Sequence, residues 1–323
     1  MANHYAAIDC GTNTVRLLLV KERNGKLSEV DRRLVITRLG EGVDASGVLS
    51  SEALERTFAA LDDFAAQIKE VGGAKLRVVA TSAARDARNL GDFVAGVKAR
   101  LGVEPEIISG EEEATLSYFG AIHGLPKLPK PILVMDIGGG STELTIGGRK
   151  RIKQVTSLDV GSVRLKERIL KGDPPAKAEI ADAKEFVDSL VDESGLDFSE
   201  VYSFVGVGGT VTSLSAIVQG LDEYDREQVH DSVISTDDLR ALAARLLTTP
   251  IAQIKQIPTM EDGREDVIAS GCLIAREVMR FVGLPMRVSE ADLLDGVIEG
   301  LVNADQEEDA AAAAIIATMA AIV

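Results

Sequence analysis

A polar turn between two apolar strands occurs twice in this chain, and the repeat constrains the fold more than any other feature. Residues 5–20, YAAIDCGTNTVRLLLV, and residues 132–147, ILVMDIGGGSTELTIG, both run from an apolar strand through an Asp into a small polar turn and a second strand. Aligning them pairs Asp9 with Asp136. Repeats at so long a spacing indicate duplicated domains, because solenoid units are far shorter.

A second pair of similar segments supports the duplication. The strand pattern at 76–80 runs into TSAARDA, much as the strand pattern at 202–207 runs into GGTVTSL. Each half therefore has a hairpin and a later strand that leads into a helix, which predicts an α/β fold in two related halves. Helical periodicity predicts helices at 51–71, 91–101, 111–122, 177–191, 236–247 and 266–282.

Prolines mark the expected junction between the halves. Pro126, Pro129 and Pro131 interrupt the chain just before the second hairpin. The final segment, from Asp305 on, opens with acids and continues with alanines, which predicts a helix that packs on a domain or on a partner subunit. The expected division is residues 1–125 plus 304–323 for the first domain and 126–303 for the second.

Composition narrows the class of partner. Lys and Arg total 35 against 51 Asp and Glu, and this net charge of −16 opposes binding to nucleic acid or to an anionic membrane. An anionic substrate must then be captured locally, by backbone N–H groups, a few arginines and bound cations. Only Cys10 and Cys272 are present, no leader is evident, and the longest apolar stretch is too short for a bilayer. We expect a cytoplasmic protein.

Glycine-rich segments are the expected phosphate contacts. Their unpaired backbone N–H groups cradle phosphate oxygens without net positive charge, and a helix N-terminus adds its dipole. One such loop alone is usually just a turn, but three in repeated register favour a phosphate site. The expected contacts are Gly11, Thr12, Asn13 and Thr14 in the first hairpin, Gly138, Gly139, Gly140, Ser141 and Thr142 in the second, and Gly208, Gly209 and Thr210 at a helix start.

Carboxylates beside the turns are candidate ligands of Mg²⁺ or Mn²⁺. Mg²⁺ prefers one or two carboxylates with phosphate oxygens and waters, which Asp136 and Glu143 can supply, with Asp9 as a third candidate. The alternative for Asp9 and Asp136 is a carboxylate that merely closes its turn. Arg16 holds in the first hairpin the position of Glu143 in the second. We expect Arg16 to contact phosphate, with an exposed strand arginine as the alternative.

An acidic helix start supplies a candidate base. In IISGEEEATLSYF, residues 107–119, Ser109 is placed as N-cap and Glu112 as its capping-box partner, which accounts for both residues but not for Glu113. A carboxylate in this first turn, aimed into a cleft, can accept the proton of a water that attacks phosphorus. The alternative is a solvated run of acids.

Two arginines are further candidates for phosphate. Arg85 follows TSA at a helix start, where its guanidinium can bind phosphate bidentately, and Arg264 lies in EDGREDV. The chain lacks a P-loop, a zinc-protease motif and a nucleophile elbow, and its three histidines are scattered. We therefore expect water, and not a protein nucleophile, to attack the substrate.

Taken together, these motifs resemble the exopolyphosphatase and guanosine-pentaphosphate phosphatase (Ppx/GppA) family of the actin, Hsp70 and sugar-kinase superfamily. The resemblance implies two ribonuclease-H-like domains with the active site in the cleft between them, and a final helix that returns to the first domain. It rests on IDCGTNTVRLLLV (8–20), ATSAARDARN (80–89), IISGEEEA (107–114), MDIGGGSTEL (135–144), SLDVGSVRLKE (157–167) and GVGGTVTSLSA (206–216).

The resemblance also implies roles. In such proteins the last Glu of the S-G-x-E-E-A motif activates water, which here is Glu113, the cation carboxylates fall on Asp136 and Glu143, and the T-S-A-x-R arginine falls on Arg85. The expected substrate is inorganic polyphosphate, with guanosine pentaphosphate as the alternative, and a monovalent cation and a homodimer complete the expectations. A superfamily kinase and a non-enzymatic actin-like protein are the rival hypotheses.

The chain also departs from the family pattern. It stops at residue 323, where longer relatives carry further helical domains, and Leu294 stands where many longer relatives have an arginine. We therefore expect activity on short to medium polyphosphate chains.

Overall fold

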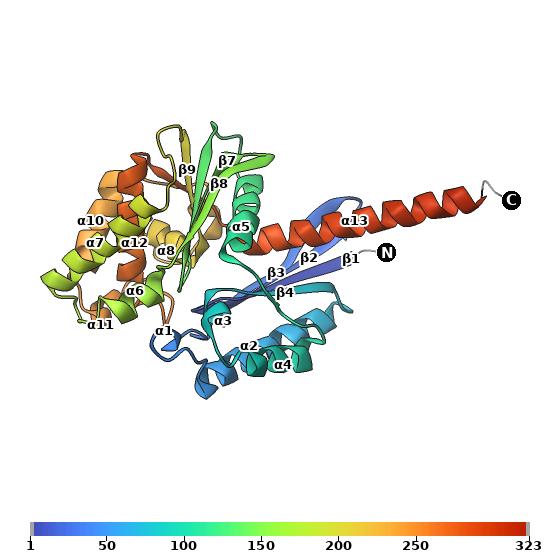
Figure 1. Cartoon of the computed structure of the whole chain (residues 1–323), viewed down its shortest axis with the longest axis horizontal. Helices are drawn as coiled ribbons and strands as arrows, with labels where there is room; N and C mark the ends of the chain where they lie inside the picture. Colours follow the sequence, from blue (N-terminus) through green and yellow to red (C-terminus); the bar gives the residue numbers. More distant parts are fainter. Residues whose placement is uncertain (1–2, 321–323) are drawn as a thin grey trace.

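Two α/β lobes make up the protein, each built on its own sheet (Figure 1). The computed structural model describes the backbone of residues 3–320 and the side chains of residues 3–307. The first sheet has the order β3-β2-β1-β4-β5 and the second the order β10-β11-β9-β6-β7-β8. The strands are β1 (Asn3–Cys10), β2 (Thr14–Arg23), β3 (Lys26–Ile36), β4 (Lys75–Ala80), β5 (Glu106–Ile107), β6 (Ile132–Ile137), β7 (Thr142–Gly148), β8 (Arg151–Leu158), β9 (Ser203–Val207), β10 (Val233–Ile234) and β11 (Met286–Val288).

The two sheets share the order of five strands. In each, three antiparallel strands are followed by two strands parallel to the first, β4 and β5 after β1 and β9 and β11 after β6, and the second sheet adds β10 antiparallel to β11 at its edge. The registers match as well, because Asp9 lies opposite Arg16 and Asp136 lies opposite Glu143. The predicted fold class, with duplicated ribonuclease-H-like halves, is confirmed. The third strand of the first sheet, β3, was not predicted, because its exposed and charged sequence lacks clean alternation.

The six predicted helices are all present, and serine caps explain where several of them begin. Ser50, Ser109 and Ser235 each accept a hydrogen bond from the backbone N–H three residues on. Only half of the predicted capping box at Ser109 forms, because the Glu112 carboxylate binds Arg77 instead. The helices are α1 (Val43–Ser46), α2 (Ser51–Glu70), α3 (Ser82–Asp86), α4 (Leu90–Leu101), α5 (Gly110–Gly124), α6 (Ser162–Arg168), α7 (Lys177–Glu193), α8 (Gly208–Gln219), α9 (Arg226–Val229), α10 (Thr236–Leu246), α11 (Ile251–Ile254), α12 (Ile268–Val282) and α13 (Leu293–Ala320).

Helices cover both faces of each sheet. Alternate residues of β1 point to opposite faces, so that Ile8 packs with α2 and α4, whereas Tyr5 and Ala7 pack with the first turns of α13. In the second lobe the largest core joins one sheet face to α7, α8, α10 and α12. The opposite face is covered by α5, through residues such as Tyr118 and Ile122. Both sheets are therefore buried, as the near-continuous apolar strands require.

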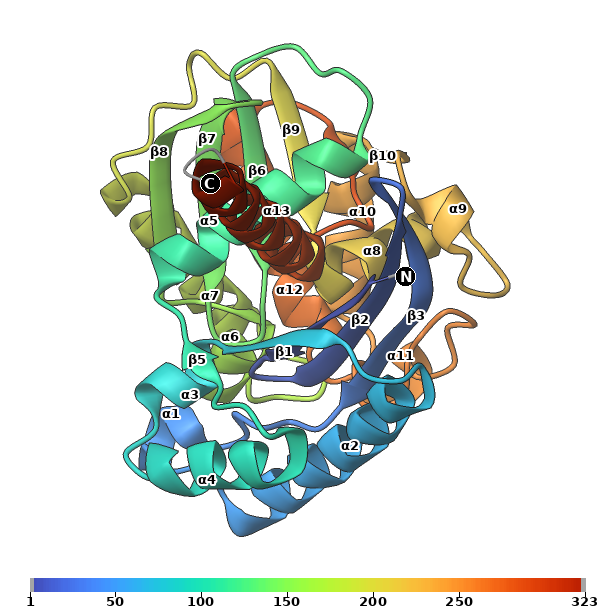
Figure 2. The same cartoon turned by 90° about the vertical axis from the view of Figure 1, so that its right-hand side faces the viewer.

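Between the lobes, α5 and α13 cross in close contact (Figure 2). Glycines permit this approach: a Cβ at Gly120 would overlap the backbone of Asp292, and a Cβ at Gly296 would overlap that of Leu116. The expected domain division, with residues 1–125 plus 304–323 in the first domain and 126–303 in the second, stays a prediction. It assigns helix α5 to the first domain, although this helix packs on the second sheet. Whether the Ala-rich end of α13 packs on a domain or on a partner subunit lies outside the described side chains.

No helix in the part of the chain that the structure describes combines the length and the apolar character needed to cross a bilayer. Both cysteines are fully buried and free, and Cys10 is part of the core of the first lobe.

Candidate active site

The tips of the two repeated hairpins touch each other. A Cβ at Gly139 would lie 2.9 Å from the Cβ of Thr12, and a Cβ at Gly140 would lie 2.9 Å from Thr12 Oγ1 and collide with Ser82. Only glycine lets the second turn approach the first so closely. The structure thus brings together two turns that lie far apart in the sequence.

A narrow cavity, partly open to solvent, lies where the turns meet. Its walls come from both lobes. Of the residues selected from the sequence, those that line it are Asp9, Gly11, Thr12, Asn13, Thr14, Arg16, Glu113, Asp136, Gly138, Gly139, Gly140, Ser141, Gly208, Gly209, Thr210 and Arg264.

Three selected residues lie outside this wall. The Thr142 hydroxyl donates to the Val160 carbonyl at 2.6 Å in a fully buried position, so that its side chain is structural. Glu143 lies beside Asp136 across the strand pair and is buried. The Arg85 guanidinium does not line the cavity, and it donates hydrogen bonds to the Glu113 carboxylate at 2.8 Å and to the Ile108 carbonyl at 2.9 Å.

Four acids converge around the cavity, and all are buried: Asp9, Glu113, Asp136 and Glu143. Burial raises the pKa of Glu113 to about 7, although Arg85 lowers it. Burial likewise raises the pKa of Asp136 to about 6, and it raises the pKa values of Asp9 and Glu143. Carboxylates held this way are poised to take up a cation or a proton near neutral pH.

Arg16 lies between Asp9 and a further acid, Asp292. Its Nε and Nη2 donate to Asp9 Oδ2 at 3.0 and 2.7 Å, and its Nη1 donates to Asp292. Burial raises the pKa of Asp292, but Arg16 and Arg32 outweigh this effect and the net pKa is lowered. Asp292 is therefore ionised and holds Arg16 at the cavity wall.

Several oxygens at the site have no hydrogen-bond partner among the described residues. They are Asp9 Oδ1, Glu143 Oε2 and Thr12 Oγ1, all buried. Nowhere in the described residues do three His, Cys, Asp or Glu side chains gather as a ready-made metal centre. The donor set consists of oxygens and leaves room for phosphate and water, which fits Mg²⁺ or Mn²⁺ better than zinc.

A helix N-terminus closes one side of the cavity. Gly208 begins α8 with φ of +83°, and a Cβ there would lie 2.6 Å from Asp136 Oδ1, so both the backbone and the space require glycine. The Arg264 guanidinium lies over Gly209 and pairs with Glu261 at 2.8 Å. The amides that begin α8 and the guanidinium thus face the same space.

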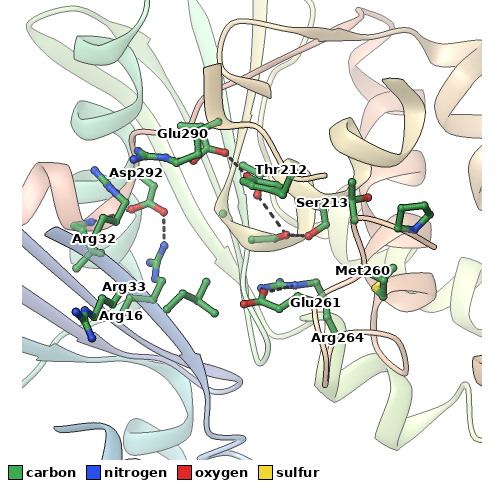
Figure 3. A pocket seen from close by; sticks show the side chains of 18 residues that line it. Arg16, Arg32, Arg33, Thr212, Ser213, Met260, Glu261, Arg264, Glu290 and Asp292 are labelled. Atoms are coloured by element: carbon green, nitrogen blue, oxygen red, sulfur yellow. Dashed lines mark hydrogen bonds and ion pairs between the residues drawn. The ribbon is translucent and has the colours of Figure 1, made fainter. Parts of the chain in front are cut away.

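A wider cavity, also partly open to solvent, adjoins the first and shares Arg16, Gly208, Gly209 and Arg264 with it. Figure 3 shows Arg16, Arg32 and Arg33 on one wall, with Thr212, Ser213, Met260 and Arg264 opposite. Arg226 and Tyr224 also line it. Its five arginines form a cationic wall on a chain of net charge −16, and three acids of the same lining, Glu261, Glu290 and Asp292, partly neutralise it.

Ion pairs join the two lobes around the cavities. Arg164 of α6 is buried and pairs with Asp44 at 3.1 Å and with Asp86, both from the first lobe. Other pairs between the lobes are Arg38 with Asp266 at 3.0 Å and Arg226 with Glu29 at 2.8 Å. Charged contacts thus bridge the two lobes beside the cavities.

Sequence patterns missed several residues of the site. Ser117 donates to Asp136 Oδ2 at 2.5 Å, and its place one helical turn after Glu113 was an available signal. Ser157 and Arg164 lie in the motif SLDVGSVRLKE, to which no role was assigned. Arg32 and Asp292 gave no local signal, because only the packing of β3 and α13 brings them to the cavities.

Comparison with known proteins identifies a single family. The sequence profile of the Ppx/GppA phosphatase family matches residues 18–304. Exopolyphosphatase 2 of Mycobacterium tuberculosis is 38% identical over 92% of this chain and 98% of its own length. The crystal structure of an exopolyphosphatase-like protein, also 38% identical, superposes with a TM-score of 0.88 over 92% of this chain and 97% of that one. A Ppx/GppA protein of Aquifex aeolicus, 30% identical, gives a TM-score of 0.80 over 94% and 99%.

Proposed function

The chain belongs to the Ppx/GppA phosphatase family, and on this premise we propose that it is an exopolyphosphatase that releases terminal orthophosphate from inorganic polyphosphate. The observation that carries the proposal is the meeting of both glycine turns and Glu113 in one narrow cavity. A terminal phosphate fits such a cavity, because backbone N–H groups on both walls can bind its oxygens.

Binding comes first in the proposed mechanism. The turns around Gly11 and Gly138 and the N-terminus of α8 hold the terminal phosphate, while Arg16 adds positive charge. Asp136 at the cavity wall and its cross-strand neighbour Glu143 would hold the divalent cation, with Asp9 as a third carboxylate at the wall. A bound Mg²⁺ or Mn²⁺ neutralises phosphate charge that this acidic site would otherwise repel.

Proton transfer follows. Glu113, with a pKa raised to about 7, takes a proton from water as the water oxygen bonds to the terminal phosphorus. The bond from that phosphorus to the bridging oxygen breaks, and the electron pair stays on the shortened chain. Arg85 keeps the Glu113 carboxylate oriented and supports its ionised form.

The rest of the substrate lies in the outer cavity. Arg32, Arg33 and Arg226 line it beside the shared Arg16 and Arg264, so that several successive phosphates can be bound there. The finite size of this cationic wall supports a preference for short to medium chains.

Guanosine pentaphosphate is the second candidate substrate, and one observation favours it. The outer cavity also has apolar and aromatic surface, from Leu34, Tyr224, Met260 and Leu294. A nucleoside can pack on such a surface while its 5′ phosphates extend into the inner cavity. Leu294, where many longer relatives are expected to have an arginine, contributes to this apolar part.

One experiment tests both proposals. Phosphate release is measured side by side from short polyphosphate, long polyphosphate and guanosine pentaphosphate, first with Mg²⁺ or Mn²⁺ and then with chelator. Fastest release from short polyphosphate, lost on chelation, supports the main proposal, whereas fastest release from guanosine pentaphosphate favours the second. No cation-dependent release from any of the three refutes both. The monovalent cation, the homodimer and the cytoplasmic location stay predictions.

A further inference from the structure

The three carboxylates expected to face the cation share one feature. Each has one oxygen held by a neighbouring donor: Asp9 Oδ2 by Arg16, Asp136 Oδ2 by Ser117 and Glu143 Oε1 by Ser157. The second oxygens of Asp9 and Glu143 are buried without a partner among the described residues. The second oxygen of Asp136 lies at the cavity wall beside Gly208. Buried oxygens without partners are costly, so such a pattern indicates that something else binds them.

Ser117 is placed for this role by α5. It lies one turn after Glu113 on the same helix, is 1% exposed, and donates to Asp136 Oδ2 at 2.5 Å. Because its hydroxyl occupies Oδ2, the other oxygen of Asp136 is directed toward the cavity. The same helix thus positions both the proposed base and the proposed cation ligand.

Ser157 is placed by the sheet. It lies directly opposite Glu143 in the β7–β8 pair and donates to Glu143 Oε1 at 2.7 Å. The first residue of α5 presses on it from the other side, since a Cβ at Gly110 would lie 2.6 Å from Ser157 Oγ. The serine therefore lies between a helix start and the carboxylate.

We propose that Ser117 and Ser157 are positioning residues for the divalent cation, which fix Asp136 and Glu143 so that one oxygen of each is left for the ion. The inference rests on the proposed function only for the presence of that cation. Hydrogen bonds to the outer oxygens of metal-binding carboxylates orient them and typically change metal affinity about 10-fold to 100-fold.

The test measures cation binding without substrate. Free and bound Mn²⁺ are separated by electron paramagnetic resonance for the wild type, Ser117→Ala and Ser157→Ala, and the Mg²⁺ concentration at half-maximal phosphate release is recorded in parallel. We expect Mn²⁺ binding to weaken about 10-fold in each variant, with the rate largely recovered at high Mg²⁺.

Ser215→Ala is the matched control. Ser215 is also a fully buried helical serine with a hydroxyl partner, Ser232 at 2.7 Å, but it lines neither cavity. We expect this variant to bind Mn²⁺ like the wild type. Gly110→Ala, which displaces Ser157 without altering a carboxylate, should weaken Mn²⁺ binding as Ser157→Ala does.

The inference is overturned if both serine variants bind Mn²⁺ within twofold of the wild type. It is also overturned if the control loses as much affinity, or if the wild type binds no Mn²⁺. These outcomes are separate from a failure of the proposed function, which appears as absence of phosphate release from polyphosphate by a wild type that does bind Mn²⁺.

Discussion

The guanidinium of Arg85 donates a hydrogen bond to the carboxylate of Glu113 at 2.8 Å, so that the proposed base is paired with a cation at the start of α5. The two residues come from different motifs, Arg85 in α3 and Glu113 in the first turn of α5, and the tertiary fold brings them together. Burial raises the pKa of Glu113 to about 7 and Arg85 opposes the rise, which leaves the carboxylate able to exchange a proton near neutral pH.

Replacing Glu113 by Gln should lower kcat about 10²-fold to 10⁴-fold, because general-base assistance is lost. The neutral amide suits a buried position where the charged form is disfavoured, so the melting temperature at pH 8 should not fall. Phosphate release and thermal unfolding are measured on the same preparation. Glu112→Gln, on the exposed side of the same turn, is the control and should keep its activity. A Glu113→Gln enzyme with wild-type turnover would exclude Glu113 as the base.

Replacing Arg85 by Gln should move the pH dependence of kcat/KM. The base must be ionised, so the wild-type value should rise with pH through about 7. Arg85 lowers the pKa of Glu113, and its removal should therefore shift this rise to higher pH. The profile is recorded from about pH 5.5 to 9 at one Mg²⁺ concentration. Arg88→Gln, which removes a guanidinium bound to the Ser46 carbonyl, should leave the profile in place. A shift to lower pH in Arg85→Gln would contradict the assignment.

The buried acids should make folding stability depend on pH when no divalent cation is present. The pKa of Asp136 rises from 3.8 to about 6 on folding, so the folded protein binds more protons between these values. The stabilising contribution of Asp136 to the free energy of unfolding is complete below about pH 4 and is lost as the pH rises through about 6. Between these two pH values the free energy of unfolding falls by about 1.4 kcal/mol for each pH unit. Asp136→Asn removes this loss. In chelator at pH 8 the variant should resist urea better than the wild type, and the difference should vanish near pH 4.

Added Mg²⁺ should make the wild type more stable than Asp136→Asn at pH 8. The ion binds the folded state and stabilises it, and the variant lacks one of the carboxylates that bind the ion. Urea unfolding with Mg²⁺ and with chelator measures both effects. Lower stability of Asp136→Asn in chelator at pH 8 would show that the buried charge is compensated in some other way.

Substituting the glycine that begins α8 should damage the site as well as the fold. At Gly208, φ is +83° and a Cβ would lie 2.6 Å from Asp136 Oδ1. Gly220, just after the same helix, has φ of +67° with nothing within 4 Å of a Cβ, and it is the matched control. Each change to Ala should cost about 1–2 kcal/mol of stability through backbone strain. Only Gly208→Ala should also lose phosphate release, and equal activity of the two variants would refute this role.

How far the sequence predicts the site depends on how local each interaction is. The two turns and Glu113 were found because a strand, a glycine turn and a helix cap leave a pattern within a few residues. Thr142 was selected by its place in such a pattern, but its hydroxyl binds the Val160 carbonyl instead. The spacing of Ser117 from Glu113 places both on one face of α5, but the contact of Ser117 with Asp136 could not be predicted, because it requires α5 to lie on the second sheet.

The sequence by itself determined the duplicated strands, their glycine turns and the position of Glu113 in the first turn of a helix. Backbone conformation and hydrophobic periodicity act over short stretches, so these features can be read from the sequence. The tertiary structure alone decided which charges meet. Arg16 of the first hairpin meets Asp292, which lies just before α13, and the arginines of the outer cavity gather from β2, β3 and α9 and from the segment before α12. Such pairs form across separate elements, because the burial of apolar faces places the helices and strands and thereby brings polar groups distant in sequence within bonding distance.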